Sequence, residues 1–121
     1  MIATQIARII AEYMVFLNFT GEDQLDPDLA VKVMEALAGD LEELDRGFLR
    51  ELINAFATIA PEYSGEAQQL VRDIAYHFFL EEALAADDPV RLAELEAIRD
   101  ARYAAEEMSE AGSAPTSGGD A

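Results

Sequence analysis

The residues of this chain that could act in catalysis are few and lie far apart. His77 is the only histidine, and it follows Asp73 by four positions, so both side chains would share one face of a helix. Such a pair can orient a general base, but the same spacing is typical of an ion pair on a helix surface. No serine or threonine stands in a nucleophile motif, and cysteine is absent. The sequence therefore predicts no catalytic residue, and we expect a protein that is not an enzyme.

Metal and cofactor sites have equally little support in the sequence. Glu12, Glu35, Glu51 and Asp73 place one acid on each of four expected helices, but a di-metal bundle also needs Glu-x-x-His motifs, and none occurs. The acidic segment at residues 23–28 lacks the ligand spacing of a calcium loop. No glycine-rich phosphate loop is present. We therefore expect neither a metal nor a cofactor.

Charge is the most informative property of the sequence. Asp and Glu number 25 against 8 Lys and Arg, which gives a net charge of -17 on 121 residues that are 51% hydrophobic. A chain with this much hydrophobicity is expected to fold despite its charge. The negative surface repels nucleic acid and anionic membranes and attracts basic proteins. We therefore expect a basic protein partner, and no nucleic-acid or membrane partner.

Hydrophobic periodicity predicts an all-α fold. Apolar residues recur at spacings of three and four, and proline or glycine separates the periodic segments. The expected helices cover residues 4–18, 27–44, 45–60, 64–85 and 89–108. Short connections make successive helices antiparallel, so we expect a compact up-and-down bundle of four helices plus a C-terminal fifth helix. One domain should span residues 1–108, and the Gly, Ser, Pro and Ala content of residues 109–121 predicts a disordered tail.

Each expected helix carries an apolar stripe that should face the core. The first stripe comprises Ile2, Ile6, Ile9, Tyr13 and Phe16, widened by Ile10 and Leu17. The third comprises Phe48 or Leu49, Leu52, Ile53, Phe56 and Ile59. In the fourth helix a second apolar face includes Tyr76, Phe79 and Leu80, which needs a cover. The fifth helix is the expected cover, and a homodimer through these three residues is the alternative.

The expected topology gathers acidic residues at two poles. The first pole comprises Glu42, Glu43, Glu81, Glu82 and Asp87. The second pole comprises Glu22, Asp23, Asp26 and Asp28, together with Glu62 and Glu66. Helix capping explains Asp26, Asp28, Asp45 and Asp88. The four glutamates of the first pole are expected at helix C-termini, where the helix dipole disfavours negative charge. A binding role would explain them, so the first pole is the preferred partner-binding surface and the second pole is the other choice.

In size, charge and fold class the chain resembles small acidic proteins that block a basic nuclease or nucleic-acid-binding enzyme, such as toxin immunity proteins and phage inhibitors that mimic nucleic acid. The resemblance implies inhibition of, or immunity to, a basic protein by direct occlusion. It rests on no motif, so no binding residue is carried over. Two alternatives stay open: a structural or oligomerisation module, and an acidic-surface protein of a high-salt organism with no charge-specific partner.

The N-terminal segment favours a cytoplasmic location. It has no basic region ahead of its apolar residues, and Glu12 interrupts the apolar stretch from Ile9 to Phe19. A signal peptide needs such a basic region, and a membrane span needs a longer uncharged run.

Overall fold

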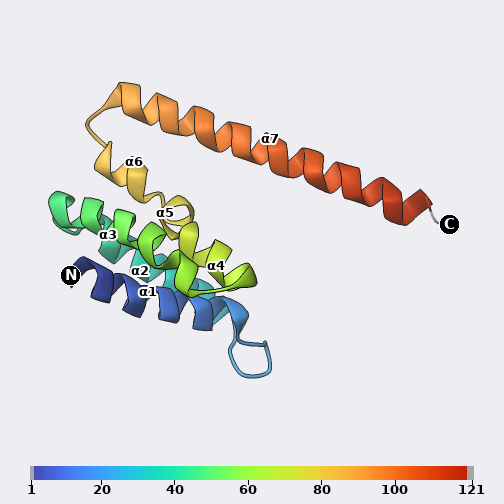
Figure 1. The fold of residues 1–121 in the computed structure, drawn as a ribbon, viewed down its shortest axis with the longest axis horizontal. Coiled ribbons are helices and arrows are strands. Elements are labelled where there is room, and N and C mark those ends of the chain that lie inside the picture. Colours follow the sequence, from blue (N-terminus) through green and yellow to red (C-terminus); the bar gives the residue numbers. More distant parts are fainter. Residues whose placement is uncertain (1, 120–121) are drawn as a thin grey trace. The chain divides into compact units, whose positions relative to one another are not determined.

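The computed structural model describes residues 2–119, with side chains described for residues 2–109. Over this range the chain is helical, and no strand is present. The elements are α1 (Ile2–Phe19), α2 (Pro27–Glu42), α3 (Arg46–Ile59), the short 3-10 helix η1 (Ala60–Glu62), α4 (Gly65–Arg72), α5 (Ile74–His77), α6 (Leu80–Leu84) and α7 (Pro89–Gly119) (Figure 1). The predicted all-α class is confirmed.

The chain divides into two compact units, which are described separately. The first unit spans Met1–Leu84 and contains α1 to α6, and the second spans Ala85–Ala121 and contains α7. The single domain over residues 1–108 and the disordered tail over residues 109–121 stay predictions. Side chains beyond Ser109, and residues 120–121 altogether, lie outside the described residues.

The core of the first unit forms around α3, which packs most extensively against α1. Its buried residues are Leu49, Leu52, Ile53, Ala55, Phe56 and Ile59. This face matches the predicted stripe, with Leu49 buried and Phe48 only partly buried. Val71, Ile74, Phe78 and Leu80 complete the core from α4, α6 and the residues around α5.

The buried face of α1 differs from the predicted stripe. Its buried residues are Ala3, Ala7, Ile10, Ala11, Met14 and Leu17. The exposed fractions of the predicted core residues are 71% for Ile2, 60% for Ile9, 56% for Tyr13 and 55% for Phe16. Alanines at the helix surface allow the two backbones to approach closely, so α1 packs through its alanine-rich face. The prediction was wrong for these four residues. Ile10 and Leu17, which were expected to widen the stripe, are buried.

The predicted fourth helix is divided into α4, α5 and α6. The helix first breaks at Asp73, whose N–H is shared between the carbonyls of Gln69 and Leu70. The second break lies at Phe79, which has a φ of 55° in the left-handed region. These breaks turn Leu80 into the core, where α6 contacts α3. The prediction of a continuous helix from residue 64 to residue 85 was therefore wrong. The predicted up-and-down bundle of four helices is not confirmed.

Three predicted helix starts are confirmed by their capping hydrogen bonds. The side chain of Asp26 accepts from the N–H of Asp28 at 2.9 Å, and that of Asp45 accepts from the N–H of Phe48 at 3.0 Å. In the second unit, Asp88 accepts from the N–H of Arg91 at 3.1 Å. Each cap satisfies a backbone donor that the first turn of a helix leaves without a partner.

The backbone at Phe79 gives a direct test of this break. A left-handed residue with a side chain costs about 1–2 kcal/mol, and glycine avoids this cost. We expect Phe79→Gly to be more stable than Phe79→Ala by about 1 kcal/mol, measured by urea unfolding followed by circular dichroism. At the exposed helical position Ala57, replacement by glycine should instead lower stability by about 1 kcal/mol. Equal stability of the two variants at position 79 would contradict the left-handed conformation.

Candidate protein-binding site

The acids of the first pole lie at two different kinds of helix end. Glu42 ends α2 and Glu43 caps it, and both side chains are exposed, as predicted. Glu81 and Glu82, however, lie in the first turn of α6, where the helix dipole favours negative charge. The prediction that the helix dipole disfavours these glutamates was therefore wrong for Glu81 and Glu82. It holds for Glu42 and Glu43. Asp87 belongs to the second unit and is described apart from the others.

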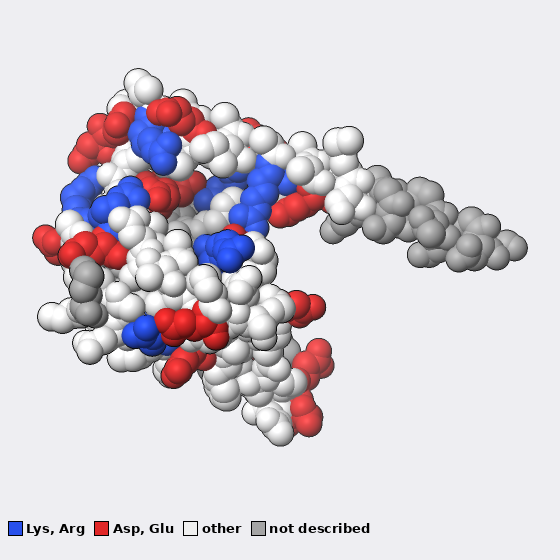
Figure 2. All heavy atoms as spheres, viewed as in Figure 1, with Lys and Arg blue, Asp and Glu red and all other residues white. Residues whose placement is uncertain are grey.

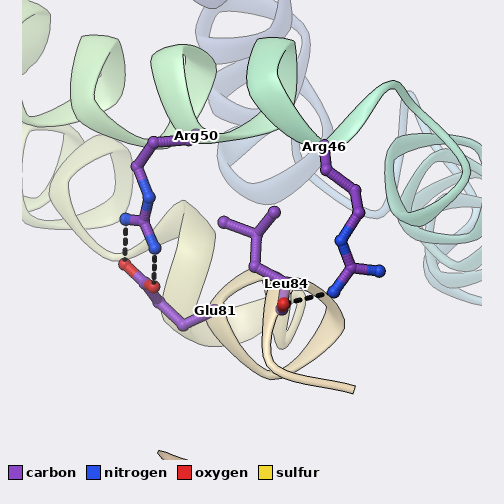
Figure 3. A network of polar contacts seen from close by, with 4 residues as sticks. All are labelled: Arg46, Arg50, Glu81 and Leu84. Carbon is purple, nitrogen blue, oxygen red and sulfur yellow. Dashed lines mark hydrogen bonds and ion pairs between the residues drawn. The ribbon is translucent and has the colours of Figure 1, made fainter. Parts of the chain in front are cut away.

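Two arginines of α3 further reduce the acidity of the first pole. Arg50 forms a two-pronged ion pair with Glu81, with Nη1 to Oε2 at 2.9 Å and Nη2 to Oε1 at 2.6 Å (Figure 3). This hydrogen bonding raises the pKa of Arg50. Figure 3 also shows Arg46 donating to the backbone carbonyl of Leu84. Glu81 is therefore already paired with Arg50 within the chain.

The acids of the second pole near the connection between α1 and α2 are not neutralised by the basic side chains that the structure describes. We call residues 20–28 the acidic loop, after Glu22, Asp23, Asp26 and Asp28, all of which are exposed. None of the four carboxylates forms an ion pair with a basic side chain within residues 2–109. The chain has no Lys or Arg between Arg8 and Lys32. Figure 2 shows acidic atoms at the lower end of the first unit, where Figure 1 places this loop.

A tight turn holds the tip of the acidic loop. The carbonyl of Gly21 accepts hydrogen bonds from the N–H groups of Gln24 and Leu25, both at 3.0 Å. A Cβ atom at position 21 would lie 2.7 Å from Oδ1 of Asp23, so glycine leaves room for this carboxylate. The turn therefore presents Glu22 and Asp23 to solvent while Asp26 caps α2.

A cavity adjoins the acidic loop. Its volume is about 270 Å³, and apolar side chains of the loop and of α2 line most of it, including Leu25, Val31 and Met34. Glu22 is an acidic residue of the same lining. Arginine and lysine combine an apolar stem with a charged head, so one such side chain fits both parts of this lining. The cavity could not be predicted from the sequence, because its walls come from separate elements.

The other acids assigned to the second pole behave differently. Glu62 accepts two hydrogen bonds from Arg8, with Nη2 to Oε2 at 2.7 Å and Nε to Oε1 at 2.9 Å. The Arg8 guanidinium lowers the pKa of Glu62 through these bonds. Glu66 lies in the first turn of α4, where it complements the helix dipole. The structure therefore leaves the acidic loop as the part of the second pole that is open to a partner.

A second surface of the first unit is apolar rather than acidic. We call Ile2, Ile6, Ile9, Tyr13 and Phe16 of α1 the apolar seam. Beside it lies a cavity of about 310 Å³, lined by Ile9, Tyr13, Val33 and Leu37 among others. By length and composition α1 could also cross a membrane, although one third of it is buried inside the first unit. A core helix of a soluble protein and a signal sequence share these properties, so this helix alone does not decide between them.

The residues considered for catalysis lie around α5. Nε2 of Gln69 donates to Oδ2 of Asp73 at 2.7 Å, and the ring of His77 packs edge-on against Tyr76 with centroids 5.6 Å apart. Within the part of the chain that the structure describes, no group of three or more His, Cys, Asp or Glu residues is arranged to hold a metal ion.

Comparison of the chain with protein-family models, with curated proteins and with solved structures finds no match.

Proposed function

We propose that this chain is an acidic helical protein-binding domain that inhibits, or confers immunity to, a basic protein by direct occlusion. The observation that carries the proposal is the acidic loop, whose four exposed carboxylates have no basic partner within residues 2–109 and adjoin a cavity of about 270 Å³. A basic partner would supply the missing positive charge. In the same proposal the domain acts in the cytoplasm.

The acidic loop is a better docking surface than the first pole. Bringing a basic partner to Glu81 would compete with Arg50, which already forms two hydrogen bonds to it. At the acidic loop the approach breaks no ion pair formed within residues 2–109. Opposite charges raise the rate of encounter, and a side chain that enters a cavity then gives specificity.

The proposed mode of binding follows from the lining of the cavity. An arginine or lysine of the partner would place its stem against Leu25 and Val31 and its charged head near Glu22. Glu22 and Asp23 would stay at the rim, while α2 and α1 hold the loop from both sides. We also propose that α1, α2 and α3 keep the up-and-down order of the predicted bundle and act as a rigid support for this loop.

In-cell photo-crosslinking tests this function. Gln24 is exposed, uncharged and central in the acidic loop, so a photoreactive amino acid there keeps all four carboxylates. We expect illumination to join this position to a protein of positive net charge, whose activity the purified domain then inhibits. The same amino acid at Ala57, an exposed position of α3, should give no such adduct. Adducts from Ala57 alone, or adducts only with acidic proteins, would contradict the proposal.

A further inference from the structure

The spacing of the apolar seam is that of a coiled coil. Its members are separated alternately by four and three residues, which is the a and d pattern of a heptad repeat. A helix that only covers a domain core has a broader stripe with a period of 3.6 residues. In α1 the core contacts come from the alanine-rich face, and four of the five seam residues remain more than half exposed. The seam is therefore a second apolar face that the first unit does not cover.

The area of this face is suitable for a stable interface. A half-exposed aromatic or isoleucine side chain offers on the order of 100 Å² of surface. With the neighbouring Phe19, which is also half exposed, the seam supplies most of the roughly 800 Å² that each partner buries in a standard interface. An apolar patch of this size is at the upper end of what a monomer exposes, and the largest patch on a protein is often functional.

Charge favours a second copy of the chain as the occupant. Each copy carries a net charge of -17, so two copies repel each other wherever their acidic surfaces meet. Helix α1 contains only one acid, Glu12, and one base, Arg8, which is paired with Glu62. Asp40 of α2 is the one acid in the lining of the cavity beside the seam. Few acids lie at this face, so two copies can meet there with less repulsion than at their acidic surfaces.

The acidic loop sets the relative direction of the two helices. It directly follows α1, so a parallel pair would bring two acidic loops side by side. An antiparallel pair places them at opposite ends, separated by about the 27 Å length of an 18-residue helix. The antiparallel arrangement also pairs opposite ends of the two helix dipoles.

We infer that the apolar seam of α1 is a homodimer interface, in which α1 packs antiparallel against α1 of a second copy. The cavity of about 310 Å³ between α1 and α2 then receives a side chain of the opposite helix, next to Ile9 and Leu37. This interface is separate from the acidic loop and leaves both loops of the dimer open. It also differs from the predicted homodimer through Tyr76, Phe79 and Leu80, of which Leu80 is buried in the core.

Sedimentation velocity of the full chain over a concentration series tests the inference. The wild-type protein should be a dimer, and Ile9→Glu should weaken dimerisation at least about 30-fold, because it places a charge in the centre of the seam. The charge-matched control Ala57→Glu on α3 should stay a dimer. Circular dichroism verifies folding, and Tyr13→Lys replaces Ile9→Glu if that variant is unfolded. A monomeric wild-type protein, or a dimer unaffected by either seam variant, would overturn the inference.

Two further measurements separate the remaining possibilities. A spin label at Asn18, near the end of α1, should lie more than about 20 Å from the label of the second copy in an antiparallel pair. A distance below about 15 Å would overturn the antiparallel arrangement. Flotation with neutral phosphatidylcholine vesicles should leave the dimer in solution. Binding to these vesicles with loss of the dimer would overturn the inference in favour of a membrane surface.

Discussion

Replacing Phe56 by alanine is expected to lower the free energy of unfolding by about 4 kcal/mol. Phe56 is 1% exposed and lies on the face of α3 that packs against the core of the first unit. The change removes the aromatic ring and leaves a cavity that neighbouring helices can fill only in part. Denaturant unfolding followed by circular dichroism measures the loss of stability. Small domains have a free energy of unfolding of roughly 5–15 kcal/mol, so the variant should stay largely folded without denaturant.

Phe48 is the matched control for this prediction. It lies on the same helix but is only partly buried, so Phe48→Ala should cost about 2 kcal/mol at most. A loss at position 48 equal to or larger than the loss at position 56 would contradict the assignment of the core face of α3.

Reversing two charges of the acidic loop is expected to weaken the binding of a basic partner about tenfold at low salt. The variant Glu22→Lys/Asp23→Lys leaves Asp26 in place to cap α2, so the fold should not change. The control is Glu42→Lys/Glu43→Lys at the end of α2, which alters the net charge by the same amount. An oligo-arginine peptide serves as the probe, and fluorescence anisotropy measures its dissociation constant. The control variant should bind nearly as well as the wild-type protein, because the affinity depends on where the charges lie.

The sequence was sufficient for the parts of the fold that depend on local signals. Helix α3 combines large apolar residues at helical spacing with a capping Asp45 and a stopping Pro61, and all three signals agree. The face of α1 was misjudged because large apolar residues were weighted above alanine. Close helix packing uses small residues, so Ala3, Ala7 and Ala11 are core positions.

The division of the predicted fourth helix could not be read from the sequence. A left-handed residue is normally glycine or asparagine, and Phe79 gives no such signal. Packing of Leu80 against the core stabilises this conformation, and that packing depends on α3. Tertiary contacts therefore override the local preference at this position.

The candidate site was visible only in part. The four carboxylates of the acidic loop lie close together in the sequence, so their clustering was predictable. The ion pairs that occupy one acid in each pole join residues far apart in the sequence, with a separation of 31 positions for Arg50 and Glu81 and of 54 for Arg8 and Glu62. Periodicity gives no information on such pairs. The sequence favoured the first pole because Glu81 and Glu82 were expected at a helix C-terminus, whereas the break at Phe79 places them in the first turn of α6.

The salt dependence of oligo-arginine binding to these two variants tests the central claim most directly. Charge attraction between exposed groups acts over about 10 Å at 0.1 M salt and over much shorter distances at 1 M. We predict that Glu22→Lys/Asp23→Lys loses affinity and has a flatter salt dependence than the wild-type protein, whereas Glu42→Lys/Glu43→Lys keeps both. At high salt the three proteins should converge. If the Glu42 and Glu43 variant loses the affinity instead, or if both variants bind alike, the acidic loop is not the docking surface for a basic partner.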